Sequence, residues 1–215
     1  MSKTPYIRRH LFRMLHIDSL ESILKDGMYA PNTKFDPDYV NIGDRTLIAQ
    51  RGEFSLPISP GGVLSDYVQF YFGGCSPMLL NIKTGYRGIQ QRSQSEIVYI
   101  CSHIEAIINT CPEWCFTDGH AKDKLTTYYN KVDDLALIDW AAVEDKYWKS
   151  TEENPDKMRR KQAEFLVKKY VPKECFSGVI VHDDAAAAQV TTIEEKVGVS
   201  LPIYVDKNHK YYYND

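Results

Sequence analysis

Residues 59–72 read SPGGVLSDYVQFYF, and three residues later the chain continues with SPMLLNIKT at residues 76–84. Pro60, Gly61 and Gly62 predict a turn, because proline fixes its φ angle and glycine accepts positive φ values. The apolar run at residues 77–83 is short and bounded by turn formers, which is typical of a buried strand. The middle of the chain is therefore expected to form a turn, an aromatic segment and a strand.

The segments on either side alternate between strand-like and helix-like patterns. Further strands are expected at residues 6–17, 94–102, 176–183 and 200–206. Helices are expected at residues 19–26, 103–110, 134–148, 156–171 and 184–198, with one more after the turn at 116–121. Strands dispersed among helices without a regular βαβ order favour a mixed α+β domain over a doubly wound sheet.

Residues 28–63 form a long stretch without clear periodicity, broken by prolines and glycines. Loops longer than about 12–15 residues inside a compact domain are usually functional or disordered. Because this stretch is rich in Asp, Asn, Arg and Tyr, we expect it to be a lid or a substrate-binding loop. Gly27, just before it, is expected to end the preceding helix.

The composition is that of an ordinary globular protein. The chain has 215 residues, of which 43% are hydrophobic and 26% charged, and this length predicts a single domain over residues 1–215. The net charge of −3 argues against a broadly basic nucleic-acid-binding protein, but leaves room for a local basic groove. No apolar run approaches the ~20 residues of a membrane span, so we expect a soluble, cytoplasmic protein without membrane association.

The five cysteines are an odd number, which suits reduced thiols in the cytosol. Cys111 and Cys115, with His103 and His120 nearby, offer half of a zinc site, but the second ligand pair of structural zinc sites is absent. Buried free thiols and no bound metal are therefore expected. The GxGxxG, GxxxxGK[ST] and GxSxG motifs are also absent, which removes the usual support for dinucleotide-fold, P-loop and serine hydrolase mechanisms.

Three residues each allow two interpretations from the pattern alone. Glu164 has cationic neighbours at helical spacing, so it lies either on a solvent-exposed helix face or in a site that keeps it ionised. An ionised carboxylate suits a proton acceptor or a stabiliser of positive charge. Arg51, taken alone, is typical of an exposed loop arginine. His16 closes an apolar strand, where a hydrogen-bonded core histidine is the more common case.

Basic residues gather at three places, and the middle cluster mixes cations with Gly, Tyr and Gln in KTGYRGIQQR, residues 83–92. A groove for single-stranded nucleic acid needs cations against the backbone and a surface on which bases stack. We therefore predict that Lys83, Arg87 and Arg92 line the path of a DNA strand. The other two clusters are Arg8, Arg9 and Arg13, and Lys157, Arg159, Arg160 and Lys161.

The 59–78 segment resembles the signature of the DarT family, bacterial toxins that ADP-ribosylate DNA bases with NAD. That signature consists of a PGG turn, DYVPFYF and SPM, in this order. HIDSL at 16–20 with ILKDG at 23–27 resembles the family's N-terminal segment, and NIGD followed by Arg51 resembles its N-I-G stretch and arginine. EIVYI, FTDGHA, IDW and QAEFL follow in the family's order, so the resemblance covers roughly residues 8–185.

The resemblance implies an ADP-ribosyltransferase-like α+β fold with a split central β-sheet and flanking helices. It implies that Glu164 and Arg51 are catalytic and that His120 lies with the DNA-binding residues, near the base. Residues 30–58 would cover NAD. The residues implied to bind NAD are His16, Asp18, Ser19, Gly27, Arg51, Tyr67 and Tyr71.

Two residues depart from the family pattern. Ser19 stands where the family commonly has Asn, so one hydrogen bond to NAD is expected to change. Gln69 replaces the proline of DYVPFYF, which frees a backbone N–H. Neither belongs to the catalytic pair, but both leave open whether thymine or guanine is the modified base.

The function implied is an NAD-dependent mono-ADP-ribosyltransferase that acts on a base in single-stranded DNA, without a metal. It would be a monomeric toxin of a toxin–antitoxin or phage-defence system. Its partner would be a macrodomain-type, DarG-like antitoxin or another ADP-ribosyl hydrolase. Two alternatives remain: the same chemistry on RNA, because nothing in the sequence distinguishes deoxyribose from a 2′-OH, and a non-catalytic nucleic-acid-binding module.

Overall fold

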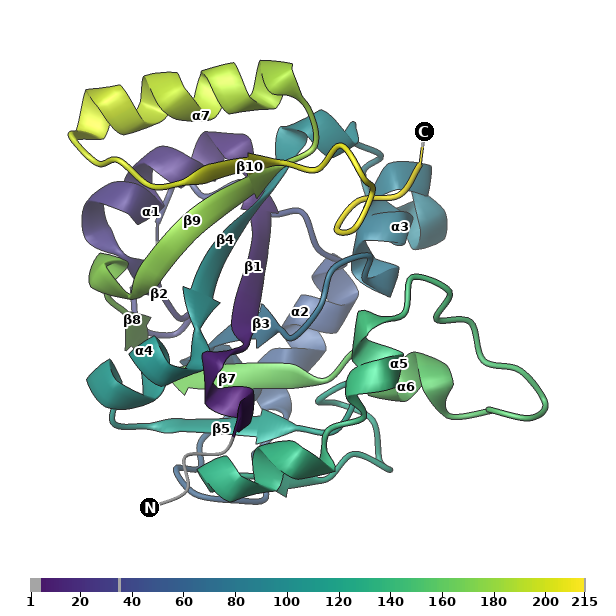
Figure 1. Ribbon diagram of the computed structural model, residues 1–215. Coiled ribbons are helices and arrows are strands. Elements are labelled where there is room, and N and C mark those ends of the chain that lie inside the picture. Colours follow the sequence, from purple (N-terminus) through teal and green to yellow (C-terminus); the bar gives the residue numbers. More distant parts are fainter. Residues whose placement is uncertain (1–4, 35, 215) are drawn as a thin grey trace.

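A computed structural model describes residues 5–34 and 36–214 (Figure 1). Its strands form one large sheet and one small sheet. The order across the large sheet is β10 (Ile203–Val205), β9 (Phe176–Val181), β4 (Ile97–His103), β1 (His10–His16), β3 (Tyr67–Tyr71), β7 (Glu164–Lys168), β5 (Trp114–Thr117) and β6 (Tyr128–Tyr129). The small sheet pairs β2 (Met28–Tyr29) with β8 (Tyr170–Val171).

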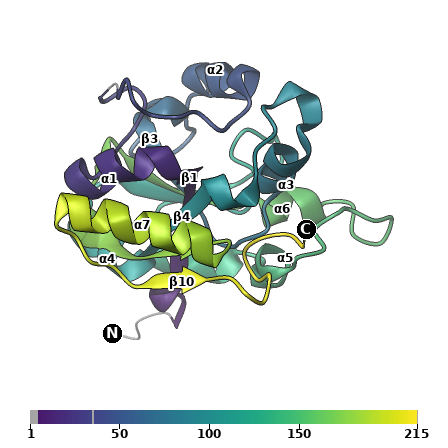
Figure 2. The same ribbon diagram turned by 90° about the horizontal axis from the view of Figure 1, so that it is seen from above.

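Helices pack around both sheets (Figures 1 and 2). The α-helices are α1 (Leu20–Asp26), α2 (Arg45–Glu53), α3 (Pro77–Thr84), α4 (Ile104–Thr110), α5 (Trp140–Glu144), α6 (Lys157–Lys161) and α7 (Asp184–Val197). Short 3-10 helices cover Pro5–Arg8, Ile17–Ser19, Leu64–Asp66, Tyr86–Gly88, Gln94–Glu96, Val132–Leu137 and Lys173–Cys175. No helix in the described residues is long and apolar enough to cross a membrane.

The large sheet is split between β1 and β3. These two strands pair at one position, Phe12 with Tyr71, whereas β1 pairs with β4 along its whole length and β3 pairs with β7 in the same way. Main-chain pairing therefore lapses over most of the boundary between the two halves. The predicted α+β fold with a split central sheet is confirmed.

Alternate residues of the strands fill two apolar layers, because successive side chains of a strand point to opposite faces. Leu11 and Leu15 of β1 pack in the cluster that holds the buried residues of α1, α4 and α7. Phe12 and Met14 of the same strand pack on the other face with α3 and the C-terminal Tyr212. Both faces of β1 are therefore covered, and its edge toward β3 borders the split.

The prediction of a strand at residues 77–83 is wrong, because this segment is helix α3. Ser76 caps its N-terminus by accepting a hydrogen bond from the Leu79 N–H at 3.2 Å. Pro77 occupies the first turn, where a missing N–H costs nothing, and Gly85 ends the helix in the left-handed region. These capping signals were in the sequence, but the unbroken apolar run hid the helical period.

The prediction of one helix over residues 156–171 is also wrong. Only Lys157–Lys161 is helical, and Glu164–Lys168 forms β7 in the interior of the sheet. A central strand is buried on both faces, so it lacks the alternation that marks a half-buried strand. The cationic residues around it gave the segment the composition of an amphipathic helix.

The remaining differences are smaller. The helix expected after the turn at 116–121 is absent, and β6 follows instead. Residues 134–148 are only partly α-helical, because α5 begins after Asp139, which caps it by accepting a hydrogen bond from the Ala142 N–H. The long unpatterned stretch at 28–63 contains α2. The helices expected at 19–26, 103–110 and 184–198 are confirmed, with Gly27 ending the first.

Candidate active site

Glu164 is the first residue of β7, and only 3% of it is exposed. Strand register places it opposite Tyr71, the last residue of β3. Thr117, at the end of β5, fixes its backbone by accepting a hydrogen bond from the Glu164 N–H at 3.0 Å. Glu164 is therefore a buried carboxylate where three strands meet, and not part of a solvent-exposed helix face.

Arg51 reaches Glu164 from α2 and forms a two-pronged ion pair with it. The distance from Arg51 Nη2 to Glu164 Oε2 is 2.7 Å, and that from Nη1 to Oε1 is 3.3 Å. The Ala121 N–H also donates to Glu164 Oε1, at 3.0 Å. Arg51 is the residue that α2 buries, so the expectation of an exposed loop arginine is wrong.

The charges of this pair support each other. Burial by itself raises the pKa of Glu164, but the Arg51 charge, the nearby His120 and the hydrogen bonds outweigh it and hold that pKa below its usual value. Burial acts against the charge of Arg51 too, but Glu164 raises the pKa of the guanidinium above its ordinary value. Glu164 is therefore ionised at neutral pH and suited to accept a proton or oppose a positive charge.

Tyr71 and His120 lie close enough to Glu164 for its charge to change their pKa values. Burial, and then Glu164, raise the pKa of Tyr71 to about 12, so its hydroxyl stays protonated; it donates to Met78 Sδ at 3.5 Å. Burial lowers the pKa of His120, more than Glu164 raises it. His120 is therefore largely neutral at physiological pH and can present a ring nitrogen lone pair.

Tyr67 does not join this group. It is fully buried in a cluster with Leu64, Cys115 and Leu166, and its hydroxyl donates to the Gly61 carbonyl oxygen at 2.5 Å. Tyr67 therefore holds the turn at residues 59–62 against β3. Its role in NAD binding stays a prediction, and the structure gives its hydroxyl a partner within the chain.

His16 and Ser19, both expected to bind NAD, are buried and already bonded within the protein. His16 Nδ1 accepts from the Asp18 N–H at 3.2 Å, and His16 Nε2 lies 2.9 Å from Arg92 Nη1. Ser19 Oγ accepts from the Val40 N–H at 2.8 Å. The serine that departs from the family pattern thus ties the segment at residues 36–41 to the start of α1.

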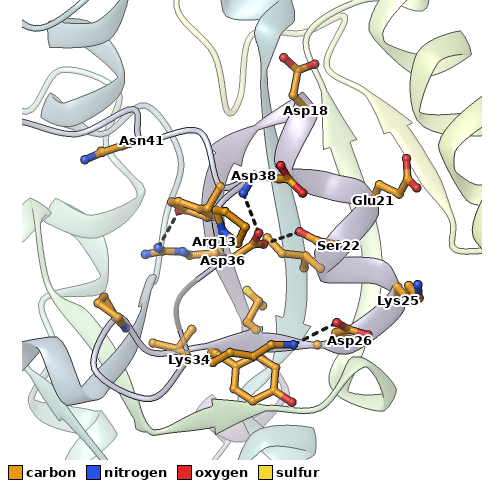
Figure 3. Close-up of a pocket in the computed structure, with 18 residues that line it drawn as sticks. Arg13, Asp18, Glu21, Ser22, Lys25, Asp26, Lys34, Asp36, Asp38 and Asn41 are labelled. Carbon is orange, nitrogen blue, oxygen red and sulfur yellow. Dashed lines mark hydrogen bonds and ion pairs between the residues drawn. The ribbon is translucent and has the colours of Figure 1, made fainter.

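Asp18 and Gly27 line a cavity of about 780 Å³ between β1, α1 and the segments 28–34 and 36–41 (Figure 3). At Gly27, where φ is +82°, a Cβ atom would lie 2.6 Å from the Tyr170 hydroxyl, so no larger residue fits there. A cavity of this size suits a small organic ligand. The first part of the unpatterned stretch, predicted as a lid or a substrate-binding loop, lines this cavity.

Two members of the basic cluster predicted to line the DNA path, Lys83 and Arg92, line a second cavity of about 360 Å³. The side chain of Arg92 is 13% exposed and is bonded to His16 and Gln90. Lys83 Nζ donates to the carbonyl oxygen of Asn214. Arg87 is exposed and stacks on the Tyr86 ring. Arg87 is thus the member of the cluster best placed to meet a DNA strand, while Arg92 faces the expected NAD-binding histidine.

All five cysteines are free and buried. Within residues 5–34 and 36–214, no three His, Cys, Asp or Glu side chains come together as a metal site would require. Cys111 packs in the same apolar cluster as Phe116, and Cys115 in the cluster of Tyr67 and Leu166.

The comparisons with known proteins decide the family. A family model described as DarT, ssDNA thymidine ADP-ribosyltransferase, matches residues 12–213. The chain belongs to the DarT family.

The relatives agree with this assignment. A DNA ADP-ribosyl transferase of Escherichia coli O127:H6 is 33% identical over 181 residues, covering 84% of this chain and 83% of the relative. Thermus sp. 2.9 DarT, solved with ADP-ribosylated ssDNA, superposes with a TM-score of 0.87 at 29% identity, covering 96% of this chain and 97% of that one. The same protein solved with NAD+ gives a TM-score of 0.81 at 29% identity, with coverages of 96% and 98%.

Membership of the DarT family confirms the predicted class of activity, NAD-dependent ADP-ribosylation of DNA. It also confirms that the chain is an enzyme, which excludes the non-catalytic binding module as its main description. The resemblance of the 59–78 segment was therefore a correct guide.

Some residues of the site were not predicted from the sequence. The Ala121 N–H and the Thr117 hydroxyl position Glu164, and Tyr128 supports this loop by donating from its hydroxyl to the Ala121 carbonyl oxygen. Arg13 lines the cavity, although it was grouped with surface cations. A backbone N–H carries no sequence signal, but the position of Arg13 in an otherwise apolar strand was a usable sign.

Proposed function

We propose that this chain transfers ADP-ribose from NAD to a thymine base in single-stranded DNA, with Glu164 and Arg51 at the reacting atoms. The observation that carries the proposal is the buried two-pronged pair at the head of β7, in which Glu164 is held ionised. Thymine is the base in the description of the family that matches this chain. NAD supplies the ADP-ribosyl group, and nicotinamide is its leaving group.

Glu164 has two tasks in this reaction. Positive charge builds on the ribose carbon as its bond to nicotinamide breaks, and a fixed carboxylate at short range stabilises that charge. A ring N–H of the base is a poor nucleophile until it loses its proton, and Glu164 accepts that proton. The electron pair of the broken bond leaves with nicotinamide, and the base nitrogen forms the new bond to the ribose carbon.

Arg51 has donors to spare for a substrate. Both of its Nη atoms contact Glu164, and its buried Nε has no hydrogen-bond partner among residues 5–34 and 36–214. A buried N–H without a partner is costly, so such a group indicates a missing acceptor. We propose that Arg51 binds an oxygen of the base or of the NAD pyrophosphate while it keeps Glu164 in place.

We propose that Tyr67 supports the nicotinamide end of NAD and that His120 contacts the base. The residues proposed to bind NAD are His16, Asp18, Ser19, Gly27 and Tyr71. Asp18 and Gly27 contact the cavity directly, which supports this assignment. Ser19 would act through the segment at residues 36–41. The DNA strand is proposed to pass Arg87, with Lys83 and Arg92 contributing charge.

The biological setting is also a proposal. An enzyme that modifies DNA with NAD harms its own cell unless the mark is removed, so we propose a macrodomain-type or other ADP-ribosyl hydrolase antitoxin as partner. Five free cysteines support a cytoplasmic location. A monomer, and one domain over residues 1–215, remain predictions.

The experiment is to incubate the purified protein with NAD and matched single-stranded oligonucleotides, and to weigh the products. We expect a gain of one ADP-ribose on DNA that contains thymine, and none when every thymine is replaced by cytosine. A gain of ADP-ribose on RNA of matched sequence, with none on DNA, would agree with the proposed mechanism but show that the substrate is RNA. A gain on guanine would correct the base.

A further inference from the structure

Arg159, on α6, holds the loop at residues 118–127 that joins β5 to β6 and carries His120. The Arg159 carbonyl oxygen accepts from the His120 N–H at 3.0 Å. The Arg159 Nη1 donates to Thr126 Oγ1 at 3.1 Å, and the Thr126 hydroxyl donates in turn to the His120 carbonyl oxygen at 2.8 Å. Arg159 therefore binds both polar groups of the His120 backbone, one directly and the other through Thr126.

The guanidinium of Arg159 is itself held in one orientation. Its Nη1 also donates to Asp118 Oδ1 at 2.7 Å, and this oxygen accepts from the Thr127 N–H at 3.0 Å. Its Nε and Nη2 each donate to a carboxylate oxygen of Asp156 at 2.7 Å. Two-pronged bonds between an arginine and a carboxylate fix direction as well as distance. Each of the three nitrogens thus has an acceptor within the protein, so the side chain is bound to the loop and to the start of α6.

Gly119 leaves the space in which this guanidinium lies. A Cβ atom at Gly119 would be 2.3 Å from Arg159 Nη1 and 2.9 Å from its Cγ. The φ angle of Gly119 is not positive, so the close approach of the arginine, and not the backbone conformation, requires a glycine here. The glycine of FTDGHA and Arg159 therefore belong to one packed unit.

The peptide group between His120 and Ala121 connects this unit to Glu164. Its carbonyl oxygen is the one that Thr126 binds, and its N–H donates to Glu164 Oε1 at 3.0 Å. Because a peptide group is planar, fixing the direction of its carbonyl also fixes the direction of its N–H. The same carbonyl oxygen accepts from the Asp123 N–H at 2.9 Å, which adds to this effect. The hydrogen bond to Glu164 thus depends on the groups bound at the opposite side of the peptide group.

We propose that Arg159 is a positioning residue for the reaction. Through Thr126, it orients the peptide group whose N–H holds the Glu164 carboxylate. The inference rests on the proposed function, because it takes Glu164 as the group that accepts the proton and opposes the positive charge. Arg159 acts through the loop, so this role needs no contact between Arg159 and NAD or the base.

Loss of this N–H changes the protonation equilibrium of Glu164. Burial raises the pKa of Glu164, and the Arg51 charge, His120 and the Ala121 N–H lower it. The other titratable groups that interact with its charge are Tyr71 on β3, Cys115 on β5 and Tyr128 on β6. Since a substitution at Arg159 changes none of these side chains, a variant that loses the Ala121 hydrogen bond should have a higher Glu164 pKa than the wild type. As the solution is made more acidic, its rate of transfer should then begin to fall at a higher pH.

The test is the pH dependence of single-turnover transfer to a thymine-containing oligonucleotide, measured for Arg159→Met, Thr126→Val and the wild type. Thr126→Val keeps the shape and all charges, and removes only the hydroxyl that joins Arg159 to the His120 carbonyl oxygen. We expect both variants to slow transfer roughly 10-fold and to move the acidic limb of the profile to higher pH by roughly one pH unit. The Kd of ADP-ribose should stay within about threefold of the wild-type value.

Three further variants separate positioning from a loss of structure. Lys157→Met removes a cation from the same helix, where its Nζ pairs with Asp145 at 2.6 Å, and it should keep the wild-type rate and profile. Arg159→Lys keeps the charge and can bind one of the acceptors, so it should fall between Arg159→Met and the wild type. Because His120 titrates as well, each profile is repeated in a His120→Gln background, where the shift should persist.

An acidic limb at the wild-type pH in folded Thr126→Val would overturn the role of Arg159. A slower rate without a shift would overturn it too, because it would indicate a structural effect alone. If Arg159→Met does not fold, Thr126→Val decides by the same comparison.

A wild-type protein that modifies no oligonucleotide would instead contradict the proposed function. Hydrogen exchange then tests the inference without the reaction. The Ala121 amide should exchange faster in Thr126→Val than in the wild type, because its carbonyl partner in the peptide group is released. Equal exchange rates would overturn the inference.

Discussion

Glu164 and Arg51 stand 113 positions apart in the sequence, and each one makes the burial of the other tolerable. A buried ion pair gains little over apolar packing, but removing one partner leaves an uncompensated charge inside the protein. The pair is therefore better explained by the reaction than by stability. The charge of Arg51 keeps the Glu164 carboxylate ionised at a buried position, where burial alone would favour its protonated form.

Arg51→Met is expected to lower the free energy of unfolding by roughly 3–5 kcal/mol at neutral pH, because Glu164 stays buried without its partner. Chemical denaturation measures this loss. Exposed Arg45, on the first turn of the same helix, gives the matched control, and Arg45→Met should change little. A similar loss in both variants would show that the helix, and not the ion pair, was damaged.

The pH dependence of that loss has a definite sign. In the wild type the folded pKa of Glu164 lies below its unfolded value, so its contribution is complete above the unfolded pKa of about 4.3 and fades as pH falls through the folded pKa. Without Arg51, burial raises the pKa of Glu164, and the variant loses stability as pH rises through that range. The difference between the two proteins should therefore grow from acid to neutral pH in urea titrations. A constant difference would contradict this account of Glu164.

Among the longer helices, α2 stands out because it buries no apolar side chain. Arg51 is the residue that it buries, and Lys122 Nζ donates to Gln50 Oε1 from the neighbouring loop. A helix that buries so little apolar surface opens locally at low cost. The ion pair to Glu164 thus fixes the helix as well as the carboxylate.

Hydrogen exchange tests this role of α2. In Arg51→Met the amides of α2 should exchange faster, while those of α7, which buries Ala186 and Val190 on the far side of the sheet, should keep their wild-type rates after allowance for global stability. Uniformly faster exchange would mean that Arg51 acts only through overall stability. Unchanged protection of α2 would show that other contacts hold it.

The elements also show what the sequence could predict. Helices with a clear signal at one end, such as Gly27 after α1 and the capping residue Asp183 before α7, were predicted with their ends nearly correct. The segment of β7 was predicted as a helix and that of α3 as a strand, because apolar runs without alternation are compatible with a helix or a strand. Glu164 is buried because it belongs to β7. Since the composition of this segment predicted a helix instead, it placed Glu164 on the surface. The catalytic role proposed for Glu164 came only from the resemblance of the motif QAEFL.

In the whole molecule, the C-terminal residues tie the layers together. Tyr212 is fully buried, and its hydroxyl donates to the carbonyl oxygens of Ile97 at 2.7 Å and Ile180 at 3.1 Å, one on β4 and one on β9. Asp206 accepts from the backbone N–H groups of Lys210, Tyr211 and Tyr212 and so fixes the tail. The tail reaches the segment between β3 and α3, since the Cys75 N–H donates to the Tyr211 carbonyl oxygen at 2.9 Å.

Tyr212→Phe is expected to lower the free energy of unfolding by about 1–3 kcal/mol, because it leaves buried carbonyl oxygens without their donor. Thermal and urea unfolding measure the effect. Tyr147→Phe removes the same hydroxyl from a side chain that is 82% exposed, and it should have no measurable effect. Equal changes in the free energy of unfolding for both variants would show that the buried hydroxyl of Tyr212 does not stabilise the protein.

The transfer of ADP-ribose by Glu164→Gln tests the central claim most directly. The substitution keeps the shape and removes the charge, and the two steps assigned to Glu164 both need the charge. Under single-turnover conditions, with NAD bound and a thymine-containing oligonucleotide in excess, we predict that the variant adds ADP-ribose to the DNA at least about 1,000-fold more slowly than the wild type. We also predict that the variant still binds ADP-ribose. A folded Glu164→Gln protein that modifies DNA at close to the wild-type rate would contradict the mechanism.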